Sequence, residues 1–107
     1  MPQPYAVAQP DRSAIDAMEG VVALEFGADW CGHCRAGAPH IASALSAFPD
    51  VKHIKVEDGS GRPLGRSFRV KLWPTLVLVR DGKELARVVR PLDDKEVLDV
   101  LASARTG

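Results

Sequence analysis

The chain is predicted to fold as one α/β domain, with a mixed sheet of four to five strands and helices on both faces. Apolar runs of strand length alternate with segments that show the 3.6-residue period of amphipathic helices. The dipeptide Asp81-Gly82 separates the last two strands by a tight turn, so these strands should pair antiparallel. A length of 107 residues with 46% apolar residues suits a single domain, 1–107, around one core.

The first three regular elements are expected over residues 12–19 (helix), 21–26 (strand) and 31–48 (helix). Asp11 can cap the first helix, and Gly20 can end it. The strand, VVALEF, is a continuous apolar run interrupted only by Glu25, which is typical of a buried parallel strand. The second helix contains Pro39, which predicts a kink, and Pro49 ends it.

The remaining elements are expected over residues 51–56 (strand), 64–68 (helix), 75–79 (strand) and 85–89 (strand), with a closing helix from Asp93. The last two strands form the hairpin already described. Asp93 should form a capping box with Glu96, and the helix that follows buries one apolar stripe. Residues 1–10 are compatible with an extended segment or an edge strand, which explains the range of four to five strands.

Charge and hydropathy exclude several classes of protein. Fourteen basic and fourteen acidic residues give a formal net charge of zero, so the sequence lacks the basic footprint of a nucleic-acid-binding protein. No apolar run approaches the roughly 20 residues that span a bilayer, so no membrane association is expected. The N-terminal residues MPQPYAVAQPDRS have neither the basic nor the apolar region of an export signal. A cytoplasmic location is therefore expected, and a purely structural disulfide is disfavoured there.

The two cysteines of the chain, Cys31 and Cys34, lie two residues apart in the stretch EFGADWCGHCRAGAP. Three kinds of site use such a pair: a structural disulfide, half of a metal site, or a redox-active dithiol. Tetrahedral zinc needs four ligands, and only His33, His40 and His53 are available to complete the set. His33 lies between the cysteines, where chelation would strain the helix, and the other two lack motif spacing. No metal is therefore expected.

The position of the cysteines favours the redox-active dithiol. Cys31 follows a buried strand and begins a helix, and Cys34 lies one turn later on the same side. The unpaired N–H groups and the dipole of a helix N-terminus should hold the pKa of Cys31 below the free value of about 8.5. The imidazolium form of His33 would stabilise the same thiolate, so His33 is counted with the catalytic residues. Cys34, deeper in the helix, is suited to attack a mixed disulfide from within.

Glu25 is the polar exception in its strand. Strand alternation places it on one face with Val21 and Ala23. A lone carboxylate in a central strand is costly unless it is neutral or paired, so either Glu25 is buried in one of these two states or this face meets solvent. Lys55 lies in the neighbouring predicted strand. Taken alone, Lys55 would be a solvated surface residue.

From about Val21 to its end, the chain resembles thioredoxins. The matching features are EFGADWCGHC, Pro39 within the helix, Trp73-Pro74-Thr75 ahead of a strand, and the Asp81-Gly82 hairpin. A C-x-x-C motif alone is a weak signal. WCGHC after a strand, with Pro-Thr about 40 residues later, is a strong one. The CGHC form is more similar to the active sites of protein disulfide isomerases than to the CGPC of ordinary thioredoxins.

This resemblance implies the thioredoxin fold and a thiol–disulfide oxidoreductase that acts on protein disulfides. Cys31 would be the nucleophile, Cys34 the resolving cysteine, and Pro74 a cis proline that faces them. Glu25 would relay protons to the deeper cysteine, and Lys55 would pair with Glu25. The residues expected to contact substrate around the dithiol are Trp30, Gly32, Trp73, Pro74, Thr75 and Arg90. A cis bond at Pro74 would leave the backbone near Trp73 free to pair with an extended substrate strand.

Three positions depart from the family pattern. Gly27 stands where many thioredoxins carry a second tryptophan, so the apolar wall beside the site should be thinner. Trp73 replaces a small aliphatic residue and enlarges the apolar docking surface. Arg90 replaces a glycine near the docking groove, where its side chain would narrow or charge the groove.

The expected activity is net reduction of protein disulfides in a reducing cytoplasm. The resemblance implies a thioredoxin-reductase-like flavoprotein as electron donor, and the redox-active pair Cys31–Cys34 needs no bound cofactor. We expect a monomer. Two alternatives are a disulfide oxidase or isomerase, which CGHC favours, and a binding module that uses the fold as a docking platform.

Overall fold

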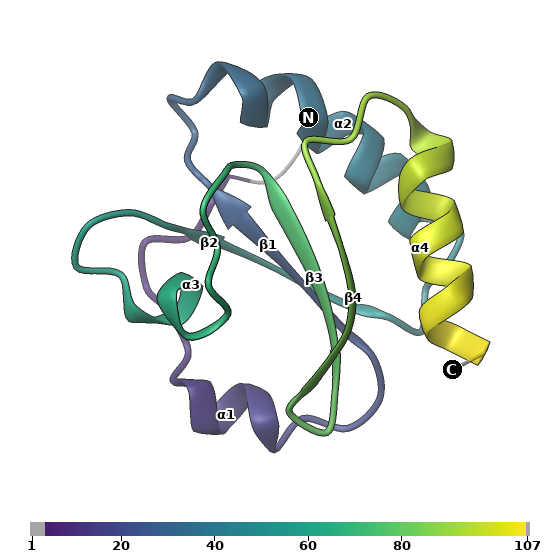
Figure 1. The fold of residues 1–107 in the computed structure, drawn as a ribbon, viewed down its shortest axis with the longest axis horizontal. Coiled ribbons are helices and arrows are strands. Elements are labelled where there is room, and N and C mark those ends of the chain that lie inside the picture. The colour runs from purple at the N-terminus through teal and green to yellow at the C-terminus, as the bar shows by residue number, and fades with distance from the viewer. Residues whose placement is uncertain (1–3, 107) are drawn as a thin grey trace.

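The computed structural model describes residues 4–106, which form a four-stranded sheet with helices on both faces (Figure 1). In chain order the elements are α1 (Arg12–Asp16), β1 (Val22–Gly27), α2 (Gly32–Leu45), β2 (Lys52–Glu57), α3 (Pro63–Ser67), β3 (Thr75–Arg80), β4 (Lys83–Val89) and α4 (Asp94–Thr106). The strands lie in the order β2-β1-β3-β4, with β1 and β2 parallel and the other pairs antiparallel. The predicted α/β class, element order and mixed sheet are confirmed.

Instead of the one core expected, each face of the sheet has its own cluster of buried apolar residues. On one face, α1 and α3 pack against buried residues of three strands, namely Val22, Leu24, Phe26, Val56, Val77 and Val79. On the other face, α2 and α4 pack against Ala23, Leu76 and Leu78. Alternation along β1 therefore turns Glu25 to the same side as Ala23, toward α2.

Two helices end earlier than the sequence predicts. α1 stops at Asp16, because the Met18 N–H already bonds to the Ile15 carbonyl in a tighter turn. α2 stops at Leu45, and the Phe48 N–H bonds back to the Leu45 carbonyl at 2.9 Å. In both cases the predicted range included a terminal turn that is no longer α-helical.

Of the two predicted N-cap side chains, one forms its cap hydrogen bond and the other does not. Asp11 has the extended backbone of an N-cap, but its carboxylate makes no cap hydrogen bond. Asp93 does cap α4, because its Oδ1 accepts the Glu96 N–H at 3.0 Å. Glu96 accepts the N–H of Leu92 instead of that of Asp93, so the expected capping box closes one residue earlier.

The N-terminal segment contributes a single bridge to the sheet. Ala6 pairs in parallel with Val56, through bonds from the Ala6 N–H to the Lys55 carbonyl (3.0 Å) and from the Glu57 N–H to the Ala6 carbonyl (2.9 Å). Within residues 4–106 the expected fifth strand is therefore reduced to this one bridge. Residues 1–3 of the predicted segment 1–10 lie outside the described residues. The bridge holds Tyr5 against the protein, where its side chain is only 5% exposed.

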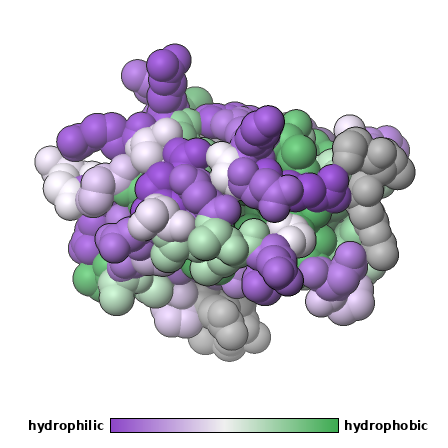
Figure 2. Space-filling view, turned by 90° about the horizontal axis from the view of Figure 1, so that it is seen from below, coloured by the Kyte–Doolittle hydropathy of each residue, from purple (hydrophilic) through white to green (hydrophobic). Residues whose placement is uncertain are grey.

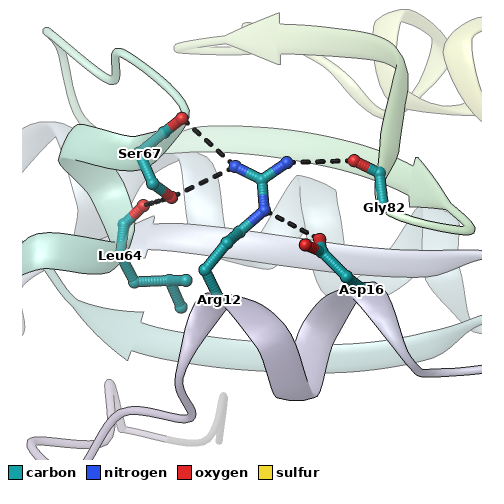
Figure 3. Close-up of polar contacts among 5 residues, drawn as sticks. All are labelled: Arg12, Asp16, Leu64, Ser67 and Gly82. Atoms are coloured by element: carbon teal, nitrogen blue, oxygen red, sulfur yellow. Dashed lines mark hydrogen bonds and ion pairs between the residues drawn. The ribbon is translucent and has the colours of Figure 1, made fainter.

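One side chain ties α1 to α3 and to the hairpin turn (Figure 3). The guanidinium of Arg12 donates to the Ser67 carbonyl at 3.2 Å, to the Gly82 carbonyl at 2.9 Å and to the Asp16 carboxylate at 2.8 Å. Its Cζ atom also lies 3.9 Å from the centre of the Phe68 ring. Arg12 thus joins three elements that are far apart in the sequence.

Replacing Arg12 with alanine should lower the free energy of unfolding by about 1–2 kcal/mol, because charge-assisted hydrogen bonds and a cation–π contact are lost at a partly exposed site. Arg12→Lys should recover only part of the loss, since an ammonium cannot make the same forked contacts. Urea unfolding followed by circular dichroism measures both variants. Equal stability of Arg12→Ala and the wild type would show that these contacts do not hold α1.

Hydrophilic side chains cover most of the side on which α1 lies, with small hydrophobic areas between them (Figure 2). Among residues 4–106, no helix combines the length and the apolar character needed to cross a membrane.

Candidate active site

β1 and α2 bring both cysteines to one end of the sheet. β1 ends at Gly27, and the Cys31 N–H bonds to the Ala28 carbonyl at 3.1 Å before α2 begins at Gly32. Cys31 is the N-cap residue of α2 and is partly exposed, whereas Cys34, one turn later, is 1% exposed. Both are free thiols. A substrate can therefore reach Cys31 directly, while Cys34 can be reached only from within the protein.

Partial burial raises the pKa of Cys31, but the groups around its sulfur lower the pKa by more, so it lies below its usual value. These groups are the backbone N–H and the thiol of Cys34, the backbone N–H of His33, and the positive charge of Arg90. The His33 side chain is exposed. His33 thus acts on the sulfur through its main chain, and Arg90 supplies a cation near the dithiol, as its expected position beside the docking groove suggests.

Burial raises the pKa of Cys34 to about 11, and the neighbouring Cys31 sulfur raises it too. Two other groups act in the opposite direction. The Ala28 N–H, 3.4 Å from the Cys34 sulfur, lowers this pKa most, and the nearby Tyr5 hydroxyl lowers it further. At neutral pH Cys34 is therefore a thiol that must lose its proton before it can act as a nucleophile.

The Glu25 carboxylate, on the strand that leads to the cysteines, is completely buried. Its Oε2 accepts a hydrogen bond from the Tyr5 hydroxyl, and its Oε1 lies 2.8 Å from Nε2 of His53. Lys55 Nζ lies 3.9 Å from Oε2, and the Lys55 side chain is 7% exposed. The solvent-facing alternative for Glu25 and the solvated alternative for Lys55 are both wrong. The sheet buries the two charges together.

Sequence reasoning missed two members of this cluster. His53 pairs with Ala23, and Lys55 pairs with Glu25, in the β1–β2 register, so His53 and Lys55 share the face that carries Glu25. Alternation along the strand was a signal that could have identified His53. Tyr5 lies in a segment without periodicity, and its position depends on one bridge, so no local pattern indicated it.

The peptide bond between Trp73 and Pro74 is cis, as the resemblance implies. Pro74 packs closely on α2, because a Cβ atom added at Gly37 would lie 2.8 Å from its Cγ. Thr75 is buried, and its hydroxyl donates to the Leu72 carbonyl at 2.5 Å. The Thr75 side chain therefore fixes this loop from inside.

The two tryptophans form an apolar ledge at the site. Trp30 is 69% exposed and lies edge-to-face on Trp73, with 5.7 Å between ring centroids. Trp30 is therefore not part of the core, and its ring is available to a substrate at this site. The Trp73 indole N–H donates to Asp58 at 2.9 Å. Gly32 is exposed, and nothing lies within 4 Å of a Cβ atom added there, so the space beside the dithiol is open.

Arg90 changes the backbone edge at which a substrate was expected to pair. Its Nε donates to the Trp73 carbonyl at 2.8 Å, and its backbone N–H donates to the Pro74 carbonyl at 2.9 Å. Its φ of 49° lies in the left-handed region that favours glycine. The expectation of a free backbone near Trp73 is thus corrected for the carbonyl, because Arg90 already occupies it.

A basic groove of about 470 Å³ begins at Trp73. Its lining residues are Asp58, Gly59, Ser60, Arg62, Arg66, Arg69, Val70, Lys71 and Trp73. Nowhere in residues 4–106, the groove included, are three His, Cys, Asp or Glu side chains grouped so that they could hold a metal ion.

Comparison with known proteins gives a consistent result. The family model named Thioredoxin matches residues 7–103. The thioredoxin of Chlamydia trachomatis is 37% identical over 98 residues, which cover 91% of this chain and 94% of that protein. Thioredoxin-2 of Pyricularia oryzae is 38% identical over 82 residues, which cover 77% of this chain and 47% of that longer protein.

A solved structure agrees with this result. Thioredoxin 2 from Pseudomonas aeruginosa PAO1, in its reduced form, matches with a TM-score of 0.86 and 48% identity, covering 100% of both chains. The chain therefore belongs to the thioredoxin family of protein-disulfide oxidoreductases.

Proposed function

We propose that this protein reduces disulfide bonds of other proteins, with Cys31 as the attacking thiol and Cys34 as the resolving thiol. The observation that carries these roles is the opposite character of the two sulfurs. Cys31 is partly exposed with a lowered pKa, and Cys34 is buried with a pKa raised to about 11. An accessible thiolate suits the first attack, and a protected thiol suits the second.

The proposed reaction has two exchange steps. The Cys31 thiolate attacks one sulfur of the substrate disulfide, and the other substrate sulfur leaves as a thiolate that takes a proton from solvent. Cys34 then loses its proton and attacks the Cys31 sulfur of the mixed disulfide. The second substrate thiolate leaves, and a Cys31–Cys34 disulfide remains. Two electrons pass to the substrate, and no bound cofactor takes part in this scheme.

The roles of the surrounding residues follow from their positions. Glu25 accepts the proton that Cys34 releases, and Lys55 stabilises the buried charge of Glu25. Trp30, Trp73 and the loop at Pro74 form the docking surface for an extended substrate segment. When substrate binds, the hydrogen bond from Arg90 Nε to the Trp73 carbonyl breaks, and the carbonyl accepts one from the substrate backbone instead. The basic groove beside Trp73 favours substrates with acidic residues next to their disulfide.

The electron donor in this proposal is a thioredoxin-reductase-like flavoprotein, and the protein acts as a monomer in the cytoplasm. These points rest on the family resemblance. The CGHC motif alone also suits oxidation or isomerisation, so the reduction potential is the quantity that discriminates.

Insulin reduction tests the proposed function. The wild-type protein should accelerate the dithiothreitol-dependent precipitation of insulin, and Cys31→Ser should be no faster than dithiothreitol alone, because the attacking sulfur is gone. Turbidity measures both rates. Ser46→Ala, which removes an exposed hydroxyl that donates to the Ser43 carbonyl, is the matched control and should behave as the wild type. A wild type that is no faster than its Cys31→Ser variant would favour a binding module.

Two replacements of His33 should separate its main chain from its side chain. His33→Pro removes the N–H that faces the Cys31 sulfur as well as the imidazole, whereas His33→Ala removes only the imidazole. Because a stabilised thiolate makes the disulfide a stronger oxidant, His33→Pro should lower the reduction potential by about 30 mV, or about 1.4 kcal/mol. His33→Ala should lower it less.

Equilibration with glutathione measures these potentials. The wild type should lie between about −270 mV, typical of thioredoxin, and about −180 mV, typical of protein disulfide isomerase. If the wild type and both variants have the same reduction potential, neither the N–H nor the imidazole of His33 determines that potential.

A further inference from the structure

The Cys34 proton has no direct route to solvent, because both Cys34 and the Glu25 carboxylate are buried. We propose that the Tyr5 hydroxyl relays this proton between the Cys34 thiol and Glu25, and that His53 exchanges it with solvent. This inference rests on the proposed role of Cys34 as the resolving thiol. It adds two residues to the site, one from the N-terminal segment and one from β2.

Tyr5 is held in place from both sides. Its backbone N–H donates to the Asp29 carboxylate at 3.0 Å, and the next residue, Ala6, makes the bridge to β2. The ammonium of Lys55 lies 4.4 Å from the centre of the Tyr5 ring. The side chain therefore enters the protein with its hydroxyl pointed at the buried carboxylate rather than at solvent.

Gly27 leaves the space in which the phenol and the thiol meet. A Cβ atom added at Gly27 would lie 2.6 Å from the Cys34 sulfur and 2.9 Å from the Tyr5 hydroxyl oxygen. These distances are too short for any larger residue without displacing one of the two groups. Many thioredoxins carry a tryptophan at this position. Here glycine leaves the space free of its own side chain, and the Tyr5 ring from the N-terminal segment occupies it.

The phenol of Tyr5 stands between the thiol and the carboxylate. Its O–H donates to Oε2 of Glu25, and its oxygen and the Cys34 sulfur lie 2.9 Å and 2.6 Å from the same Cβ position at Gly27. A phenol is both donor and acceptor, so in the relay the Tyr5 oxygen can take the Cys34 proton while its own proton goes to Glu25. Oε1 of Glu25 is bonded to His53, whose side chain is 26% exposed. Within this relay, His53 is therefore the residue that reaches water.

The charges that face the relay suit proton transfer. Tyr5, His53 and Lys55 surround Glu25 from the N-terminal segment and from β2, and Cys34 approaches from α2. Burial and the Glu25 charge raise the pKa of Tyr5, so Tyr5 rests as a phenol and passes one proton as it receives another. The Lys55 ammonium lies 3.9 Å from Oε2 of Glu25, where it stabilises negative charge on the relay.

The step balances as follows. As Cys34 attacks the Cys31 sulfur, its proton goes to the Tyr5 oxygen and the Tyr5 proton goes to Glu25. The Cys31–Cys34 bond forms, and the bond from Cys31 to the substrate breaks, with both of its electrons leaving on the substrate thiolate. Glu25 then gives its proton to His53, which releases it to solvent, and the thiolate takes up a proton there.

Tyr5→Phe is the direct test, because it removes the hydroxyl and keeps the ring. Excess reduced protein is mixed in a stopped-flow instrument with 5,5′-dithiobis(2-nitrobenzoate). The attack by Cys31 releases one coloured thiolate, and resolution by Cys34 releases a second. Tyr5→Phe should slow the second phase about tenfold or more and leave the first unchanged. Ser46→Ala is the matched hydroxyl deletion and should change neither phase.

The pH profile separates a relay from a purely structural role. Without the hydroxyl, Cys34 must lose its proton directly, so the second phase of Tyr5→Phe should rise about tenfold per pH unit toward the pKa of Cys34 and approach the wild-type rate. A second phase equal to that of the wild type at every pH overturns the proposal. So does an equal slowing of both phases. A second phase that persists in Cys34→Ser would instead overturn the proposed role of Cys34.

Two further variants keep the test independent of folding. Tyr5 is the sole tyrosine of the chain, so biosynthetic fluorotyrosine changes this phenol alone. The second-phase rate should change as fluorination makes the phenol more acidic, and an unaltered rate counts against the relay. His53→Gln keeps a donor to Glu25 but cannot carry the proton away at neutral pH. It should slow the second phase, and an unchanged rate would remove His53 from the path.

Discussion

Cys34→Ser should leave Cys31 joined to its protein substrate in a mixed disulfide that does not resolve. The first attack needs only the accessible thiolate of Cys31, whose pKa is lowered by groups that remain in this variant, chiefly backbone N–H groups and Arg90. The second attack needs the sulfur that the replacement removes. Multiple turnover should therefore be lost while covalent capture of substrate persists.

Non-reducing electrophoresis of reduced Cys34→Ser mixed with a disulfide-containing protein measures the adduct. The adduct should disappear on addition of dithiothreitol and should be absent for Cys31→Ser. An adduct that forms equally well with Cys31→Ser would exchange the assigned roles of the two cysteines.

Glu25→Gln should slow resolution by Cys34 about a hundredfold, in the range that positioned acids and bases contribute. Glutamine keeps the size of the side chain and can still hydrogen-bond to Tyr5, but it cannot take a proton. The rate of the first attack should change by less than about twofold, because Glu25 is not among the groups that lower the pKa of Cys31.

The two phases of the aromatic-disulfide reaction measure both rates for Glu25→Gln. Glu84→Gln makes the same chemical change in an ion pair with Arg87 on β4 and should leave both phases unchanged. Equal effects of the two variants on the second phase would contradict a role of the buried carboxylate in proton transfer.

Local sequence patterns predicted the elements that the backbone period determines. The run VVALEF specified β1, and the Asp81-Gly82 turn specified the β3–β4 hairpin. The two cysteines were placed correctly because a helix begins directly after that strand. These features depend on residues within one or two turns of each other, so propensity and periodicity reveal them.

The missing parts of the site depend on contacts that are distant in the sequence. His53 reaches Glu25 only through the register of two parallel strands, and Tyr5 reaches it only because one residue of the N-terminal segment bridges β2. Arg90 meets the Trp73 carbonyl because its backbone adopts a left-handed conformation that is uncommon for an arginine. Alternation along β2 indicates the face on which His53 lies but not its partner, and no local pattern encodes the contacts of Tyr5 and Arg90.

The bridge at Ala6 also bears on how the protein avoids unwanted strand addition. An uncovered edge strand is a template for aggregation and for unselective pairing with extended chains. Ala6 covers part of β2, and the edge at β4 carries Lys83, Glu84 and Arg87 together with an irregular register near Val79. An unfolded chain therefore meets charges or an occupied backbone at either edge, which leaves the loop at Pro74 as the place where extended segments can be recognised selectively.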